Sequence, residues 1–360
     1  MAKKSPAALS SDHAYVVNPA QLGGIDLLSQ IDGPAAGTRC AWVNTGSGLH
    51  YKVLVDRGLD IAEAFYKGMS LSWLSLSGAP RPEMAMHRGL DWLWGFFGGL
   101  VASCGPSSAG APCKDGTEEL GLHGRHTNLS ASLESVVGPD PLRGLTEMSI
   151  TGVVRQAKLF EPNLELRRTI TSPLGRSRII IEDTFINRGN LDAPHAWLLH
   201  MNFGYPLLEP GSQFLFAGKT TPIGEHAAAH FKKRNLRVVP EPLDEHRGTG
   251  EACVYIDPDT DRAGNVCCGV LNPKRKFGVK LTFLKKHFPR VVNWQHFGPN
   301  GQYVMGIEPA NCGVEGRNVD RQRGWLDVLR PGQVREYKIA IDVVEGPAEI
   351  AEFKKAVGGK

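Results

Sequence analysis

The sequence predicts a mostly-β protein, built as a large antiparallel β-sandwich with few short helices. Apolar residues recur at every second position in short runs, as they do in half-buried strands. Turn-forming residues separate these runs, and the 360-residue chain contains 42 glycines and 24 prolines. Residue patterns with the period of an amphipathic helix are scarce. Many short strands joined by tight turns are typical of a sandwich.

The strands can be placed in order along the chain. Residues 51–75 contain two alternating runs around a glycine-containing turn. Residues 164–173 and 177–189 predict a hairpin whose turn is Leu174-Gly175. Within the second arm, alternation groups Ile179, Ile181, Asp183 and Phe185 on one face. Further strands are expected at residues 197–202, 251–256, 267–271, 278–282, 291–296, 303–308 and 335–344.

Helices and domain boundaries give weaker signals. Residues 88–100 are apolar, but glycines at 95, 98 and 99 interrupt them, whereas residues 347–357 are good helix formers. Residues 1–18 are polar and rich in small side chains, which predicts a flexible N-terminal tail. No linker-like segment follows, so residues 19–360 are interpreted as a single domain.

Composition narrows the class of protein. Apolar residues make up 41% and charged residues 22% of the chain, which suits a packed core, and the net charge is +4 without a basic stripe. The seven cysteines show no repeated spacing, and no leader-like or membrane-length apolar run is evident. We therefore expect a cytoplasmic protein that binds neither nucleic acid nor membrane.

Three segments combine residues that suit a sugar site. Aromatic rings stack on the C–H faces of sugars, amides and guanidinium groups bind hydroxyls, and a His/carboxylate pair performs acid–base chemistry near neutral pH. Glu308 also ends an apolar run, where an unpaired carboxylate would be costly. The side chains concerned are His123, Arg125, His126 and Asn128 in 121–132, His200 and Asn202 in 195–211, and Trp294, His296, Glu308 and Asn311 in 292–317.

In their order and spacing, the three segments resemble the catalytic segments of the aldose 1-epimerase (galactose mutarotase) family. The resemblance covers residues 50–345 and includes Pro222-Ile223-Gly224-Glu225, which is similar to a Pro-x-Gly-Glu stretch of that family. It implies a galactose mutarotase-like sandwich and an isomerase active on sugars. By the same resemblance, His200 is the general acid at the ring oxygen, Glu308 is the general base on the anomeric hydroxyl, and His123 holds the sugar.

The chain also departs from the best-known epimerases. In place of their early Asn-Arg pair it has Arg57 within Asp-Arg-Gly-Leu-Asp-Ile. That segment, together with Gly-Leu-His-Gly-Arg and Gly-Ile-Glu-Pro-Ala-Asn, resembles an uncharacterised bacterial branch of epimerase-like proteins. The predicted substrate-binding residues are Arg57, His123, Arg125, Asn202, Trp294 and His296. Arg57 and Arg125 would be the partners of an acidic sugar, should the substrate carry a charge.

Other interpretations remain open at this point. The mutarotase reaction needs no cofactor, but His123, His200, His296 and Glu308 come from separate strands and could converge on a divalent metal. A metal would favour a lyase or isomerase acting on a keto-sugar or sugar derivative. A third hypothesis is a non-catalytic sugar-binding protein.

Individual residues also have purely structural interpretations. Glu308 could be a buried ion-pair partner of Arg57 or Arg317. The aromatic residues Trp92, Trp94, Phe96 and Phe97 are expected mainly in the core, with one ring in the cleft. Because exposed sheet edges often pair, a homodimer is a further hypothesis.

Overall fold

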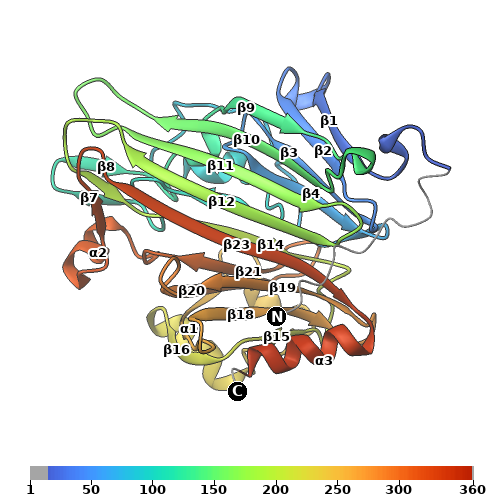
Figure 1. Cartoon of the computed structure of the whole chain (residues 1–360). Helices are drawn as coiled ribbons and strands as arrows, with labels where there is room; N and C mark the ends of the chain where they lie inside the picture. Colours follow the sequence, from blue (N-terminus) through green and yellow to red (C-terminus); the bar gives the residue numbers. More distant parts are fainter. Residues whose placement is uncertain (1–14, 359–360) are drawn as a thin grey trace.

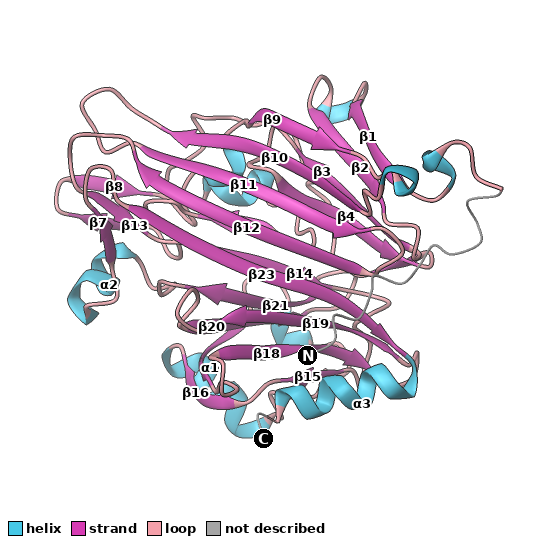
Figure 2. Ribbon diagram, viewed as in Figure 1, coloured by secondary structure: helices cyan, strands magenta, loops and turns pink. Residues whose placement is uncertain are grey.

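The computed structural model describes residues 15–358, and antiparallel sheets dominate it (Figure 1). The largest sheet has eight strands in the order β15-β18-β19-β23-β12-β11-β10-β9. Its long central strands cross the whole molecule (Figure 2). The strands are β9 (Ser132–Val137), β10 (Glu147–Gln156), β11 (Leu164–Pro173), β12 (Arg178–Asn187), β15 (Gln213–Leu215), β18 (Asn265–Asn272), β19 (Phe277–Leu284) and β23 (Val334–Glu345).

A second sheet of six strands packs against the first and carries the site described below. Its order is β16-β17-β20-β21-β14-β6. Neighbouring strands are therefore contributed by distant parts of the sequence. The strands are β6 (Ala102–Cys104), β14 (Leu198–Phe203), β16 (Gly218–Pro222), β17 (Ala252–Pro258), β20 (Arg290–Phe297) and β21 (Tyr303–Ala310).

The N-terminal part of the described chain forms a third sheet, in the order β1-β2-β3-β4-β5. Two small pairs complete the strands: the hairpin β7-β8, and β13-β22, whose strands come from distant parts of the sequence. The bounds are β1 (Gly24–Ser29), β2 (Arg39–Asn44), β3 (Leu49–Leu54), β4 (Asp60–Tyr66), β5 (Met69–Ser70), β7 (Cys113–Asp115), β8 (Glu118–Leu120), β13 (Ala193–His195) and β22 (Asp327–Leu329).

Helices are short and peripheral. Helix α1 (Gly224–Lys233) follows β16, α2 (Arg317–Arg323) lies beside β7, and α3 (Gly346–Val357) packs on β18, β19 and β23. Short 3-10 turns include η4 (Asp91–Gly95), η5 (His126–Asn128) and η7 (Asp244–His246). None of the helices that the structure describes combines the length and hydropathy needed to cross a membrane.

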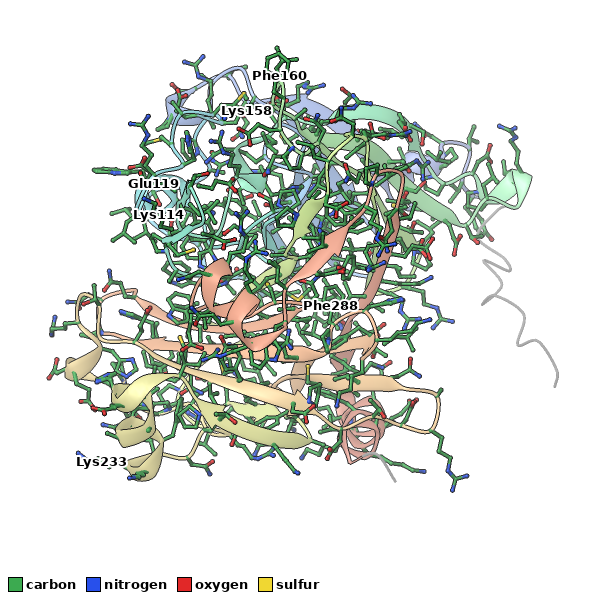
Figure 3. All side chains as sticks on the ribbon, turned by 90° about the vertical axis from the view of Figure 1, so that its left-hand side faces the viewer. Lys114, Glu119, Lys158, Phe160, Lys233 and Phe288 are labelled. Carbon is green, nitrogen blue, oxygen red and sulfur yellow. The ribbon has the colours of Figure 1, made fainter. Side chains whose placement is uncertain are left out.

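The main core lies between the sheets. Every second residue of β12 is buried, which places Ile179, Ile181, Asp183 and Phe185 on the inner face. Phe288 is fully buried, and in Figure 3 its side chain lies in the interior between the upper and lower halves. A second apolar cluster covers the outer face of the six-stranded sheet and includes Trp92 and Phe96.

The predicted fold class is confirmed: the protein is mostly β, with antiparallel sheets and few helices. The expected hairpin matches β11 and β12, and each of the seven other expected strands overlaps a strand, from β14 to β23. The expected terminal helix is α3. The elements that were not predicted are β1, β2, β6, β7, β8, β9, β10, β13, β15, β16, β22, α1 and α2. The predicted tail includes residues 1–14, which lie outside the described residues, and the division into tail and single domain stays a prediction.

Candidate functional site

A cleft of about 720 Å³ opens over the outer face of the six-stranded sheet. Its floor includes His200, Val292 and Glu308, while Pro112, beside the β7–β8 hairpin, and Ala227 of α1 belong to its walls. Figure 3 shows this hairpin, marked by Lys114 and Glu119, above the end of α1, marked by Lys233, along one side of the molecule. The volume falls in the range of small-molecule sites.

Strand register brings His200 and Glu308 together. Strands β14 and β21 are antiparallel, with Leu198 paired to Ala310 and Met201 to Ile307, so His200 and Glu308 are direct cross-strand neighbours. His200 Nε2 lies 3.3 Å from Glu308 Oε1. Both residues are buried, with 5% and 2% of their surfaces exposed.

A glycine makes room for this carboxylate. Gly306 precedes Glu308 by two residues and therefore lies on the same face of β21. A Cβ atom at Gly306 would lie 2.5 Å from Glu308 Oε1 and 3.2 Å from Cβ of Trp294. Any larger residue at this position would consequently push the carboxylate out of its place.

The environment of the pair opposes charge. Burial lowers the pKa of His200 well below its usual value, and the neighbouring His123 lowers it further. Burial raises the pKa of Glu308 well above its usual value, and the carboxylate of Glu251 adds to the rise. Among residues 15–358, neither His200 Nδ1 nor Glu308 Oε1 has an aligned hydrogen-bond partner. Burial therefore favours the neutral imidazole of His200 and the protonated carboxyl of Glu308 over their charged forms.

Aromatic rings surround the imidazole of His200. Its ring centroid lies 5.3 Å from that of Phe96, 5.4 Å from that of Trp294 and 6.2 Å from that of Trp92. Trp73 closes the group, 5.9 Å from Phe96. The exposed faces of such rings can stack on the apolar face of a sugar.

His123 lines the same cleft and has a defined tautomer. It adopts a positive φ of 57°, and its Nδ1 accepts a hydrogen bond from the backbone N–H of Gly110 at 3.3 Å. Its ring centroid lies 4.6 Å from Trp92 and 5.5 Å from His200. Burial lowers the pKa of His123 to about 4, so at neutral pH the ring is uncharged and carries its proton on Nε2.

Other predicted site residues have different surroundings. Arg57 does not line the cleft; its guanidinium donates to the carbonyl oxygens of Thr127, Pro80 and Gly95 and lies over the ring of Phe97. These bonds fasten the loop that carries the aromatic residues.

Arg125 and Asn202 also lie outside the cleft lining. Asn202 is fully buried and donates to the carbonyl oxygens of Gly98 at 3.1 Å and His200 at 3.0 Å. It therefore holds the strand that carries His200. Trp294 and His296, in contrast, do line the cleft.

The proposed metal ligands are only partly brought together. His123, His200 and Glu308 share one region of the cleft, whereas both ring nitrogens of His296 face backbone carbonyls, Nδ1 that of Gln302 at 2.9 Å and Nε2 that of Gly248 at 2.8 Å. Across residues 15–358, no group of three or more His, Cys, Asp or Glu side chains is arranged to hold a metal ion.

The structure adds cleft residues that sequence reasoning did not select. Trp73, His226, Glu251 and Cys253 line the cleft. Cys253 lies at the cleft because it pairs with Trp294 between β17 and β20. The sequence alone does not reveal this strand pairing. One expectation was wrong: Trp94 is 73% exposed and does not belong to the core, because the η4 turn directs it to solvent.

Comparisons with solved structures define the class of fold. A candidate aldose 1-epimerase from Klebsiella pneumoniae is 22% identical, with a TM-score of 0.86 over 95% of this chain and 90% of that chain. A galactose mutarotase-like protein from Clostridium acetobutylicum is 13% identical, with a TM-score of 0.60 over 89% and 98%. The galactose 1-epimerase from Lactobacillus acidophilus is 12% identical, with a TM-score of 0.57 over 90% and 99%. The fold is thus a galactose mutarotase-like β-sandwich.

The sequence itself places the chain in a family. Residues 35–343 match the model of the family described as domain of unknown function (DUF4432), and the protein belongs to that family. No curated protein matches the chain significantly in sequence.

Proposed function

We propose that the protein is an aldose 1-epimerase-like isomerase that interconverts sugar anomers by ring opening. The observation that carries this proposal is the buried contact of 3.3 Å between His200 Nε2 and Glu308 Oε1 on the cleft floor. In a cyclic sugar the anomeric hydroxyl and the ring oxygen are bonded to the same carbon. Two catalytic groups that serve these oxygens must therefore lie close together, as these two do.

The number of protons carried by His200 and Glu308 together suits this reaction. Glu308 would accept the proton of the anomeric hydroxyl while His200 protonates the ring oxygen. This requires a carboxylate and an imidazolium, whereas burial favours the two neutral forms. Both arrangements contain the same number of protons, so transfer of one proton across the contact converts one into the other. The ring then opens, the C1–C2 bond rotates, and closure on the other face returns both protons.

The remaining cleft residues would bind and orient the sugar. Trp92 and Trp294 offer ring faces beside His200, and the Nε2–H group of His123 is a donor for a hydroxyl. The mainly apolar surroundings exclude water, which strengthens the electrostatic interactions at the reacting atoms. No step of this scheme requires a metal or an organic cofactor.

The test is an NMR measurement of anomer exchange over a panel of aldoses. The wild-type protein should accelerate exchange of at least one sugar, and Glu308→Gln should reduce that rate by about 100-fold or more, because it removes the general base. A control substitution, Glu315→Gln, lies outside the cleft lining and should leave the rate unchanged.

Two results would favour other functions. Sugar binding without exchange in the wild-type protein would favour a binding protein, the third hypothesis above. Metal-dependent formation of a product that absorbs as an enone would favour a lyase. Either result would refute the isomerase proposal.

A further inference from the structure

The described lining of the cleft contains acidic side chains and no permanently cationic ones. Glu251 and Glu308 line it, and among the described lining residues there is neither a lysine nor an arginine. This is unexpected for a chain with a net charge of +4. The positive charge of the protein is therefore located elsewhere, and an anionic ligand would find no counter-charge in the cleft.

Arg57, which the sequence suggested as a partner of an acidic sugar, is already bound. All three nitrogens of the Arg57 guanidinium donate to backbone carbonyls, on residues 127, 80 and 95. Redirecting it toward a ligand would break these bonds and leave buried carbonyl groups unpaired. Arg57 therefore cannot neutralise an acidic substrate without rearranging the loop that it fastens.

Glu251 is fixed at the cleft wall. It directly precedes β17, and its Oε2 accepts a hydrogen bond of 2.6 Å from Nε1–H of Trp294, one of the rings around His200. Glu251 is solvent-exposed, and no lysine or arginine belongs to the described lining of the cleft around it. The indole keeps it on the cleft side of the strand.

From this arrangement we infer that Glu251, anchored on Trp294, is a specificity-determining residue that excludes anionic sugars. The substrates would be uncharged sugars, with amino sugars tolerated, and not sugar phosphates or uronates. This inference rests on the proposed function for its substrate class. Its physical basis is that like charges repel each other across several ångströms, an effect that salt screens.

The experiment compares matched sugars that differ only in charge. Dissociation constants are measured by quenching of tryptophan fluorescence for hexoses and for their 6-phosphates and uronates, with Glu308→Gln protein so that turnover cannot interfere. For a hexose that binds, the anionic counterparts should bind roughly tenfold more weakly or worse at low ionic strength, and the difference should shrink in high salt.

A charge reversal tests the residue itself. In the same background, Glu251→Lys should raise the affinity for the anionic sugars relative to the neutral hexose by roughly tenfold or more. Glu352→Lys, on α3 and outside the cleft lining, makes the same change in net charge and should leave the ratio unaltered. If Glu251→Lys does not fold, Glu251→Gln should still reduce the difference in affinity between anionic sugars and the neutral hexose.

The outcomes separate the two proposals. Equal or tighter binding of anionic sugars would overturn the inference that Glu251 excludes them. An affinity ratio of anionic to neutral sugars that Glu251→Lys leaves unchanged would also overturn it. If the protein discriminates against anionic sugars but the wild-type protein does not catalyse anomer exchange, the isomerase proposal is refuted and the inference about Glu251 is retained. If no sugar of any charge binds, both proposals are wrong.

Discussion

Two buried clusters of ionisable side chains differ in how fully their polar atoms are hydrogen-bonded. In the first, Arg168 lies between Asp60 and Asp183, and the guanidinium uses all of its N–H donors, toward both carboxylates, Ser103 Oγ and the carbonyl of Leu59. In the second, Glu308 and His200 touch but are not aligned for a hydrogen bond. A saturated polar cluster makes structure rigid, whereas an unsaturated one retains capacity for a ligand. The difference indicates which cluster is available for chemistry.

The largest effect on stability should come from breaking the saturated cluster. Arg168→Met leaves two buried carboxylates without their cation, so we expect the free energy of unfolding to fall by about 3–5 kcal/mol. Urea denaturation followed by circular dichroism measures this change. The neighbouring Arg167→Met is the control, since Arg167 forms only an exposed pair with Glu134 and should cost about 1 kcal/mol or less.

The same measurement on the second cluster sharpens the comparison. Glu308→Gln should unfold with a free energy close to that of the wild-type protein, because the side chain that it replaces lacks aligned partners among the described residues. If Glu308→Gln were as destabilising as Arg168→Met, the distinction between the two clusters would be lost.

A smaller effect is expected when the carboxylate is displaced without being removed. Gly306→Ala places a methyl group against Glu308 Oε1, so anomer exchange should slow by about 10- to 100-fold, as expected when a catalytic group is moved by a fraction of an ångström to an ångström. Gly138→Ala is the matched control, because no atom lies within 4 Å of its added Cβ. Unchanged exchange in Gly306→Ala would show that the position of Glu308 is not critical.

A further prediction concerns acid stability. Burial lowers the pKa of His126, which packs against Trp197 beside the saturated cluster, to about 3, and the nearby Arg168 adds to this shift. Because the folded-state pKa is lower than the unfolded value of about 6.5, the unfolded chain binds more protons between these values. The group therefore stabilises the fold above pH 6.5, and its contribution is lost as the pH falls toward 3.

This contribution can be isolated by substitution. His126→Gln should reduce the slope of the unfolding free energy against pH by about 1.4 kcal/mol per pH unit between pH 6 and 4. Denaturation at pH 7.5 supplies the reference value for each protein. Burial raises the pKa of Asp60 to about 7, so Asp60 contributes a slope of the opposite sign to the unfolding free energy against pH. Asp60 is present in both proteins, so its contribution cancels in the comparison. A slope that does not change would mean that His126 is not held neutral.

The sequence predicted strands well where alternation was regular. On β12, the buried face of Ile179, Ile181 and Phe185 follows directly from the period of two. Strand β10 was missed because Gly152 interrupts its pattern, at the point where the register with β9 shifts. Helix α1 was not predicted, although Gly224 and Glu225 of the Pro-x-Gly-Glu-like stretch form its first turn.

The candidate site was predictable only in part. His200 and Glu308 could be selected because each lies in a distinctive segment that resembles an epimerase motif. Glu251 and Trp73 could not, since their place at the cleft depends on which strands become neighbours and on how the loops close over the sheet. Arg57 was selected as a substrate ligand from its motif. The motif does not reveal that all three guanidinium nitrogens donate hydrogen bonds to backbone carbonyls.

The cross-strand pairing of His200 with Glu308 has a consequence for how such a protein can change over evolution. The reacting groups are fixed by the register of two central strands, and a slip of one residue would turn both away from the cleft. Trp73 and Glu251, which line the cleft, lie outside the regular strands, and Trp92 lies in the 3-10 turn η4. In the proposed isomerase, chemistry and substrate choice are thus encoded in separate parts of the chain, so the sugar recognised can diverge while the reaction is inherited unchanged.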